Sequence, residues 1–188
     1  MGDWVVGLGS KNSPIDDISG HVVYAMRVSK VLTMHEYDTF CCKELPGKIP
    51  NWSGNEFQGR VGDCIYDYAG GRKPKLRVSV HTKRNRKTDL GGKNVLLSDR
   101  FFYFGNKPIR LPEHLEPIVH QTQGHKSRAN QPYLQEFVSW IEGLRKPVNT
   151  IFGDPQKKDL ILSLSAEECE GICAKQHEED DLQDREIC

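Results

Sequence analysis

Two stretches near the N-terminus decide the fold of this chain: residues 2–11 read GDWVVGLGSK, and residues 20–32 read GHVVYAMRVSKVL. Both are rich in β-branched and aromatic residues, which favour strands. Residues 12–20 between them are rich in turn formers. The first stretch ends in small and polar residues, where a backbone can approach a ligand closely. We therefore expect two neighbouring strands with a ligand near the end of the first.

Periodicity outlines the remaining elements. Alternation of apolar and polar residues predicts strands at about 62–69, 75–82 and 99–105, in addition to 3–9 and 21–32. Thr33 and Glu36 have the spacing of a capping box, which predicts a short helix over 35–40. Apolar residues at helical spacing between Pro132 and Pro147 predict that the longest helix lies near 132–146.

The composition excludes several classes of protein. No stretch of about 18 apolar residues is present, so no membrane span is expected. The N-terminus lacks the basic and apolar stretches of a secretory signal, so we expect a cytoplasmic protein. In that compartment the six cysteines are expected to be free thiols rather than a disulfide framework.

Three residues of the C-terminal part have a spacing that suits one helix face. Cys169, Cys173 and His177 follow each other at intervals of four residues. They are either three zinc ligands or part of a helix face with two small apolar thiols. Structural zinc sites usually draw on loop ligands about two to four residues apart and need a fourth ligand. We therefore predict neither a metal nor a cofactor.

The formal net charge of zero hides two segments of opposite charge. Residues 72–93 carry nine basic residues and one acidic residue, which favours contact with a polyanion; a solvated hairpin face is the alternative. Within this segment we predict that nucleic acid is bound by Lys83, Arg84, Arg86 and Lys87. Residues 167–188 carry nine acidic and two basic residues, a tail that is solvated, docks a partner or masks the basic segment.

No recognised catalytic motif is found. Residues 7–11 lack the spacer of a phosphate-binding loop and precede a turn rather than a helix. A nucleophile elbow and the zinc motifs of metalloproteases and deaminases are also absent. Nothing nearby pairs Cys42 or Cys64 with a base. The sequence therefore assigns no reaction.

The aromatic run over 101–105, FFYFG, is the best candidate for stacking on a base. In a strand, Phe101 and Tyr103 point to one face and Phe102 and Phe104 to the other. One face builds the core, and the other either stacks a base or is also core. Trp52, in the loop over 43–59, either stacks on a base or anchors that loop.

We predict one ligand pocket formed by seven residues: Ser10, Lys11, Tyr24, Arg27, Tyr103, His125 and Lys126. The three cationic residues would contact phosphate, and Tyr103 or Tyr24 would stack on the base. Ser10 and His125 would hydrogen-bond to the base edge, although an exposed loop histidine is the alternative for His125. Such pockets combine apolar walls with a few convergent polar groups.

Together these segments resemble a known family. The motifs at 2–11, 23–28, 62–66, 102–105 and 123–125, with Tyr37 and Trp140, look like the nucleotide modification associated domain 2 family over residues 2–145. The resemblance implies a role beside DNA or nucleotide modification in phages and bacteria, and no particular reaction. A Gly-Asp turn that opens a strand, and a following strand that ends in the pattern of residues 25–28, also resemble the PUA-like group, which includes readers of modified bases.

We therefore expect an α+β fold, a small bent mixed β-barrel of PUA-like type with flanking C-terminal helices. Residues 1–153 would form the nucleotide-modification-associated domain, and 154–188 an extension with an acidic helical tail. The expected function is binding of DNA or a modified nucleotide, with recognition of a modified or flipped base in DNA modification or phage defence. The alternatives are an enzyme that itself modifies a base and an adaptor that docks a DNA-modification enzyme.

Overall fold

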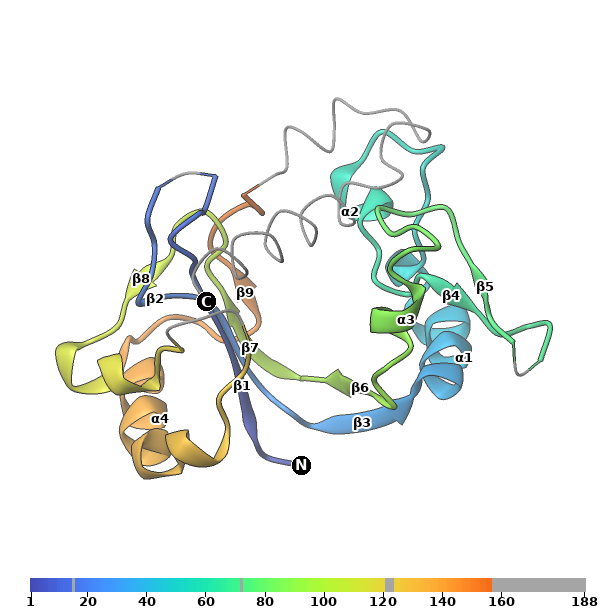
Figure 1. Ribbon diagram of the computed structural model, residues 1–188. Coiled ribbons are helices and arrows are strands. Elements are labelled where there is room, and N and C mark those ends of the chain that lie inside the picture. The colour runs from blue at the N-terminus through green and yellow to red at the C-terminus, as the bar shows by residue number, and fades with distance from the viewer. Residues whose placement is uncertain (15, 72, 121–123, 157–188) are drawn as a thin grey trace, which may run out of the picture. The chain divides into compact units, whose positions relative to one another are not determined.

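The computed structural model describes residues 1–14, 16–71, 73–120 and 124–156 (Figure 1). These residues form two compact units. The first unit contains residues 1–30 and 98–156, and the second contains residues 31–97. The acidic tail and the candidate zinc ligands lie outside the described residues. The predicted division between residues 1–153 and 154–188 therefore stays a prediction.

The first unit is built on one mixed sheet. Its strands are β1 (Trp4–Leu8), β2 (His21–Arg27), β7 (Arg100–Tyr103), β8 (Ile109–Arg110) and β9 (Thr150–Ile151). The strands lie in the order β1-β2-β7-β9, and β8 also pairs with β2. The pair β7–β9 is parallel, and the pairs made by β2 are antiparallel. The helical segments of this unit are η2 (Glu113–Ile118), η3 (Arg128–Tyr133) and α4 (Leu134–Gly143).

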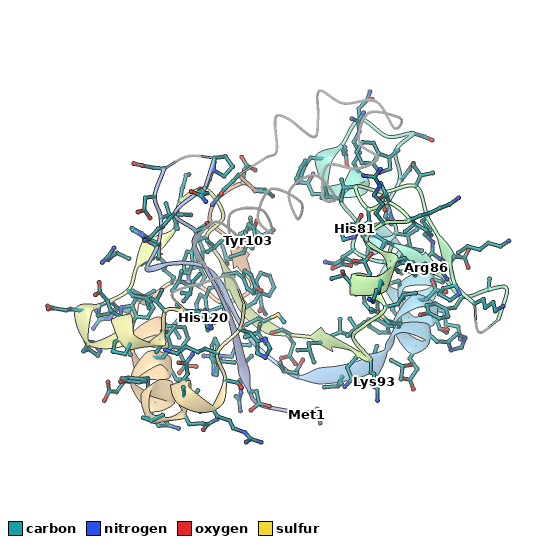
Figure 2. All side chains as sticks on the ribbon, in the orientation of Figure 1. Met1, His81, Arg86, Lys93, Tyr103 and His120 are labelled. Atoms are coloured by element: carbon teal, nitrogen blue, oxygen red, sulfur yellow. The ribbon has the colours of Figure 1, made fainter. Side chains whose placement is uncertain are left out.

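The register of this sheet separates its two faces. Ala25 of β2 lies opposite Val6 of β1 and Phe102 of β7, and these three residues point toward the core. Tyr24 lies opposite Gly7 and Tyr103, the last residue of β7, which is labelled in Figure 2. Since side chains alternate along a strand, this second set projects from the other face. We call that face the tyrosine face; it comprises Val5, Gly7, Tyr24, Met26, Phe101, Tyr103 and Ile151.

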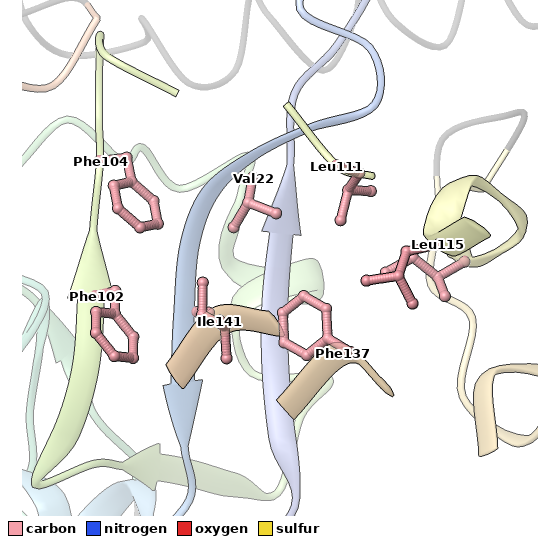
Figure 3. Packing of buried hydrophobic residues seen from close by; sticks show 9 residues of the cluster. Val22, Phe102, Phe104, Leu111, Leu115, Phe137 and Ile141 are labelled. Atoms are coloured by element: carbon pink, nitrogen blue, oxygen red, sulfur yellow. The ribbon is translucent and has the colours of Figure 1, made fainter. Parts of the chain in front are cut away.

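The core of the first unit lies between the sheet and its helical segments (Figure 3). Val22 and the stacked rings of Phe102 and Phe104 supply the sheet side. Phe137 and Ile141 of α4 are four residues apart, so they lie on one helix face and meet these strands. Of the predicted aromatic run, Phe102 and Phe104 are therefore core residues, while Phe101 and Tyr103 are half-buried.

The second unit has more loops and shorter strands. Its strands are β3 (Lys30–Thr33), β4 (Tyr66–Asp67), β5 (Lys75–Leu76) and β6 (Asn94–Leu97), and they pair as β3–β6 and β4–β5. Its helical segments are α1 (Met34–Glu44), η1 (Pro46–Lys48), α2 (Phe57–Arg60) and α3 (Arg86–Asp89). The predicted capping box is confirmed: Glu36 N–H donates to Thr33 Oγ1 at 3.2 Å, and Thr33 N–H donates to Glu36 Oε2 at 2.8 Å. Cys41 of α1 packs with Tyr37 and Cys64 in a small apolar core.

The mixed α+β class is confirmed, but none of the sheets in the described residues closes into a barrel. The predicted strands at 62–69 and 75–82 shrink to β4 and β5, which form a separate two-stranded sheet. Side chains occupy backbone groups on both sides of β4: the Arg77 guanidinium donates to the Cys64 and Tyr66 carbonyls, and Asp38 accepts the Tyr68 N–H. The helix predicted near 132–146 is α4, but it is not the longest helix in the described residues, because α1 has 11 residues and α4 has 10.

A membrane-crossing helix would have to be longer and more apolar than any helix in the described part of the chain.

Candidate nucleic-acid interface

The basic segment, residues 73–93 of the second unit, presents most of its cationic side chains to solvent. Six of them are exposed: Lys73, Lys75, Lys83, Arg84, Lys87 and Lys93. Three of the four residues predicted to bind nucleic acid, Lys83, Arg84 and Lys87, are in this set. Lys93 and the partly buried Arg86 are labelled in Figure 2. Arg72, the first cation of the predicted stretch, lies outside the described residues.

A side-chain turn fixes the exposed tip of this segment. The buried Asn85 accepts hydrogen bonds at its Oδ1 from Thr82 N–H at 2.9 Å and from the Thr82 hydroxyl at 3.1 Å. Asn side chains commonly close such turns because they mimic a backbone carbonyl. Lys83 and Arg84 lie between these two residues, so the turn holds both cations at the surface.

The single acidic residue of the segment is turned inward. Asp89 Oδ2 accepts a hydrogen bond of 3.0 Å from the Tyr66 hydroxyl and lies 3.0 Å from His81 Nδ1. Burial, followed by the nearby Asp89 carboxylate, raises the pKa of Tyr66, so this phenol stays protonated and donates. Because the Asp89 side chain is only 13 % exposed, the exposed charge of the segment is positive.

Arg86 differs from the other three predicted cations. Its guanidinium donates to the Pro74 carbonyl at 3.0 Å and lies 6.0 Å from the centre of the Tyr66 ring. These contacts tie α3 to the start of the basic segment and to β4. Its main role in the structure is therefore to position the segment.

Arg77 is the internal cation of the segment. One of its nitrogens donates to Asp38 Oδ1 at 2.7 Å, and another donates to the carbonyls of Cys64 at 3.0 Å and Tyr66 at 2.7 Å. The Arg77 and Asp38 side chains are only 16 % and 7 % exposed. The sequence analysis missed this pair, because the two residues are 39 positions apart and no local pattern links them.

The surroundings of Asp38 keep it ionised. Burial alone would raise the pKa of this carboxyl, but the Tyr68 N–H at 2.8 Å and the Arg77 guanidinium hold the pKa below its ordinary value of 3.8. Burial has the opposite effect on the neighbouring thiols, because it raises the pKa of Cys41 and Cys64. Both thiols are therefore poor nucleophiles at neutral pH.

The tyrosine face brings together two of the seven residues predicted for one ligand pocket. Tyr24 and Tyr103 are directly opposite on the antiparallel strands β2 and β7, the closest cross-strand arrangement that a sheet offers. Both are half-buried. Burial, with a smaller contribution from Asp154, raises the pKa of Tyr103. The pair offers two aromatic rings on one face of the sheet.

The other five predicted residues are spread over the first unit. Ser10 and Lys11 follow β1 in an exposed turn, in which Ser10 Oγ accepts the Asn12 N–H at 3.1 Å. Arg27 lies opposite Trp4 and Arg100, on the face that packs against α4. The structure therefore does not bring Arg27 beside Tyr24.

His125 and Lys126 lie with the helical segments rather than with the tyrosines. Both are exposed, and Lys126 Nζ donates to the Pro117 carbonyl of η2 at 2.6 Å. Leu115 and Ile118 of η2 belong to the core on the α4 side of the sheet. The contact with Pro117 therefore places Lys126 beside the helical segments that cover the core side of the sheet.

The second unit thus has a cationic surface and a set of buried polar contacts, and the first unit has an aromatic sheet face. A protein-family model described as nucleotide modification associated domain 2 matches residues 1–161. The chain belongs to this family. The resemblance to the nucleotide modification associated domain 2 family is thereby confirmed, whereas the PUA-like barrel is not. No curated protein and no solved structure matches the chain.

The match to the nucleotide modification associated domain 2 family spans the described residues of both units, and the family's name associates it with nucleotide modification. In this member of the family, no group of three His, Cys, Asp or Glu residues that could hold a metal ion is found among the described residues. The arrangement of His81, Asp89 and Tyr66 also escaped the sequence analysis. Histidine and carboxylate eight positions apart match no motif, and the loop that joins them is irregular.

Proposed function

We propose that the protein binds DNA through the basic segment and recognises a modified or flipped base within a DNA-modification or phage-defence system. The observation that carries this proposal is the six exposed cations of the segment, combined with the inward position of its one acid, Asp89. Lysine and arginine side chains that neutralise phosphates supply most of the sequence-independent affinity for DNA. The family's association with nucleotide modification agrees with a nucleic-acid ligand.

The test is a titration of a short DNA duplex at several salt concentrations. The variant K83E/R84E/K87E reverses three exposed cations and keeps Arg86, which positions the segment. We expect wild-type affinity to fall steeply with salt through counterion release, and the variant to lose binding. Each side chain that contacts a phosphate adds about 1 to the slope of log affinity against log salt, so these three would account for about 3 of the wild-type slope.

A charge-matched control separates local contact from net charge. The variant K43E/K107E/R128E makes the same charge change at exposed residues outside the basic segment. It is expected to keep most of the affinity. Equal losses in the two variants would contradict the proposal, since they would show attraction by overall charge.

For the base itself, we propose the tyrosine face as the binding surface. Tyr103 or Tyr24 would stack on the base, and Ser10 and Lys11 in the turn after β1 would contact its edge or phosphate. The direct pairing of the two tyrosines supports this choice. Arg27, His125 and Lys126 lie on or beside the α4 layer, so they support it less.

A second candidate function, enzymatic modification of a base, is favoured by one observation. The Asp89 carboxylate holds His81 Nδ1 at 3.0 Å, the arrangement by which a carboxylate orients an imidazole for general acid–base catalysis. The test is mass spectrometry of nucleosides after incubating the protein with DNA. A new nucleoside that H81Q no longer produces would support an enzyme.

A further inference from the structure

A groove in the second unit is lined by the aromatic ring of Trp52 and by the basic side chains of Lys75 and Arg77. It has a volume of about 630 Å³ and is lined by residues 50–53, Asp67 and residues 75–78. This volume is within the range of small-ligand sites, roughly 300–1,000 Å³. We propose that this groove binds one unpaired nucleotide of a nucleic acid, with its base stacked on Trp52. The inference rests on the proposed function, because it names the form of nucleic acid that the second unit takes.

The loop that carries Trp52 is held in place by its own hydrogen bonds. Asn51 N–H donates to the Gly59 carbonyl at 2.6 Å, and Ser53 N–H donates to Asn51 Oδ1 at 3.0 Å. Arg60 donates to the Gly54 carbonyl at 3.0 Å and lies 5.4 Å from the centre of the Trp52 ring. One face of the indole is therefore covered by Arg60. A base would stack on the opposite face, and its ring would complete a cation–aromatic–base stack.

Trp52 also has an unusual polar atom. Its indole N–H is buried and finds no acceptor among the described residues. An unpaired buried donor is unfavourable. In the bound state this N–H would donate to an oxygen of the nucleotide after a small rotation of the ring. Binding would then satisfy a donor that is unpaired without the ligand.

The charged groups of the groove suit the two ends of a nucleotide. Lys75 is exposed, and its ammonium group would contact phosphate. Arg77 also lines the groove, but Asp38 and two carbonyls hold its guanidinium, which lies 4.0 Å from Asp67 Oδ1, so carboxylates balance its charge. Asp67 Oδ1 accepts the Ala69 N–H at 2.8 Å, and its side chain is 38 % exposed. A carboxylate is an acceptor with two oxygens, so Asp67 would accept hydrogen bonds from N–H groups on the pairing edge of a base.

This last feature selects an unpaired base. In a duplex, the N–H groups of the pairing edge already donate to the opposite base, and both base faces are stacked. Proteins that read a base by stacking and by its pairing edge therefore use single strands or flip the base out. The groove fits this mode of recognition, whereas the exposed cations of the basic segment suit a phosphate backbone of either form.

The experiment compares the binding of a 12-residue thymidine oligonucleotide with that of a duplex of the same length. Fluorescence anisotropy measures the two affinities, and tryptophan emission reports on the tryptophan rings. We expect W52A to lower single-strand affinity about tenfold, as for loss of one base–aromatic stack, and to leave duplex affinity unchanged. W52F keeps an aromatic ring and is expected to stay within about threefold of wild type. The matched control W4F changes a tryptophan of the first unit and is expected to leave both affinities unchanged.

Emission supplies a readout that does not depend on the stability of W52A. We expect the single strand to quench wild-type emission, and this quenching to disappear in W52F while it persists in W4F. Equal losses of single-strand and duplex affinity in W52A, or quenching that persists in W52F, would overturn the inference. If W52A leaves single-strand affinity unchanged while K83E/R84E/K87E abolishes duplex binding, the inference about the groove is wrong and the proposed function stands. If wild type binds neither nucleic acid, both fail.

Discussion

The ring of Tyr24 lies over Gly7 of the neighbouring strand, so closely that a Cβ added to Gly7 would come 2.1 Å from Tyr24 Cε1. The two residues are directly opposite in the β1–β2 pair. An aromatic ring that covers a cross-strand glycine is a recognised way to protect the bare backbone of a sheet. This contact determines where the Tyr24 ring lies on the tyrosine face, beside Tyr103.

Gly7→Ala is therefore expected to displace the Tyr24 ring and to lower the free energy of unfolding by about 1–3 kcal/mol. Urea denaturation measures this change. Gly47→Ala is the control, because a Cβ at Gly47 would meet no atom within 4 Å. In a Tyr24→Ala background the same Gly7→Ala substitution is expected to cost far less, since the obstructing ring is gone. An unchanged cost in that background would show that the ring is not the cause.

Tyr103→Ala is expected to reduce nucleotide affinity more than it reduces stability. Its neighbour Phe102 is 1 % exposed and faces the core, whereas Tyr103 is half-buried on the tyrosine face. Loss of one stacked base costs about tenfold in affinity, and Phe102→Ala costs about 3–5 kcal/mol of stability. Thermal melts and nucleotide titrations on both variants measure the two effects. If Tyr103→Ala destabilises the protein as much as Phe102→Ala does, Tyr103 is a core residue.

The parts of the fold that could be predicted are those with a local cause. Thr33 and Glu36 form their capping box because the spacing alone brings them together on one helical turn. Alternation in β7 likewise separated Phe102 from Tyr103, since strand geometry leaves no other arrangement. By contrast, β9 has two residues and pairs in parallel with β7, about 48 positions away, which no local pattern encodes.

The candidate site divides in the same way. Lys83, Arg84 and Lys87 are exposed because they are charged, and the turn that Asn85 closes holds the first two at the surface. The inward contacts of Arg77 and Arg86 depend on Asp38, Tyr66 and Pro74, which reach them only through the tertiary fold. A basic stretch therefore predicts a positive surface and does not reveal which of its cations support the structure.

Arg77→Met is expected to lower the free energy of unfolding by about 3–5 kcal/mol, because it leaves the buried Asp38 carboxylate without its cation. Chemical denaturation measures the loss. Lys48→Met is the control, since it removes an ion pair with Asp63 whose side chains are both more than half exposed, and it is expected to cost less than about 1 kcal/mol. Adding Asp38→Asn to Arg77→Met is expected to restore part of the loss, because the unpaired charge is then removed. Equal costs for the two single variants would contradict a buried role for Arg77.

The stability of the protein is expected to fall in acid, in part through Asp38. Its folded pKa lies below the ordinary 3.8, against the effect of burial, because of the Tyr68 N–H and Arg77. As the pH falls through about 4, the unfolded chain takes up this proton first, so the free energy of unfolding decreases until the folded carboxyl is protonated too. Denaturation at a series of pH values measures the slope, and Asp38→Asn is expected to make it shallower. Asp17, whose pKa is lowered by hydrogen bonds with Ser19, is fully exposed, so Asp17→Asn serves as the control and is expected to change the slope less. A slope that Asp17→Asn alters as much as Asp38→Asn would show that the buried pair does not govern acid stability.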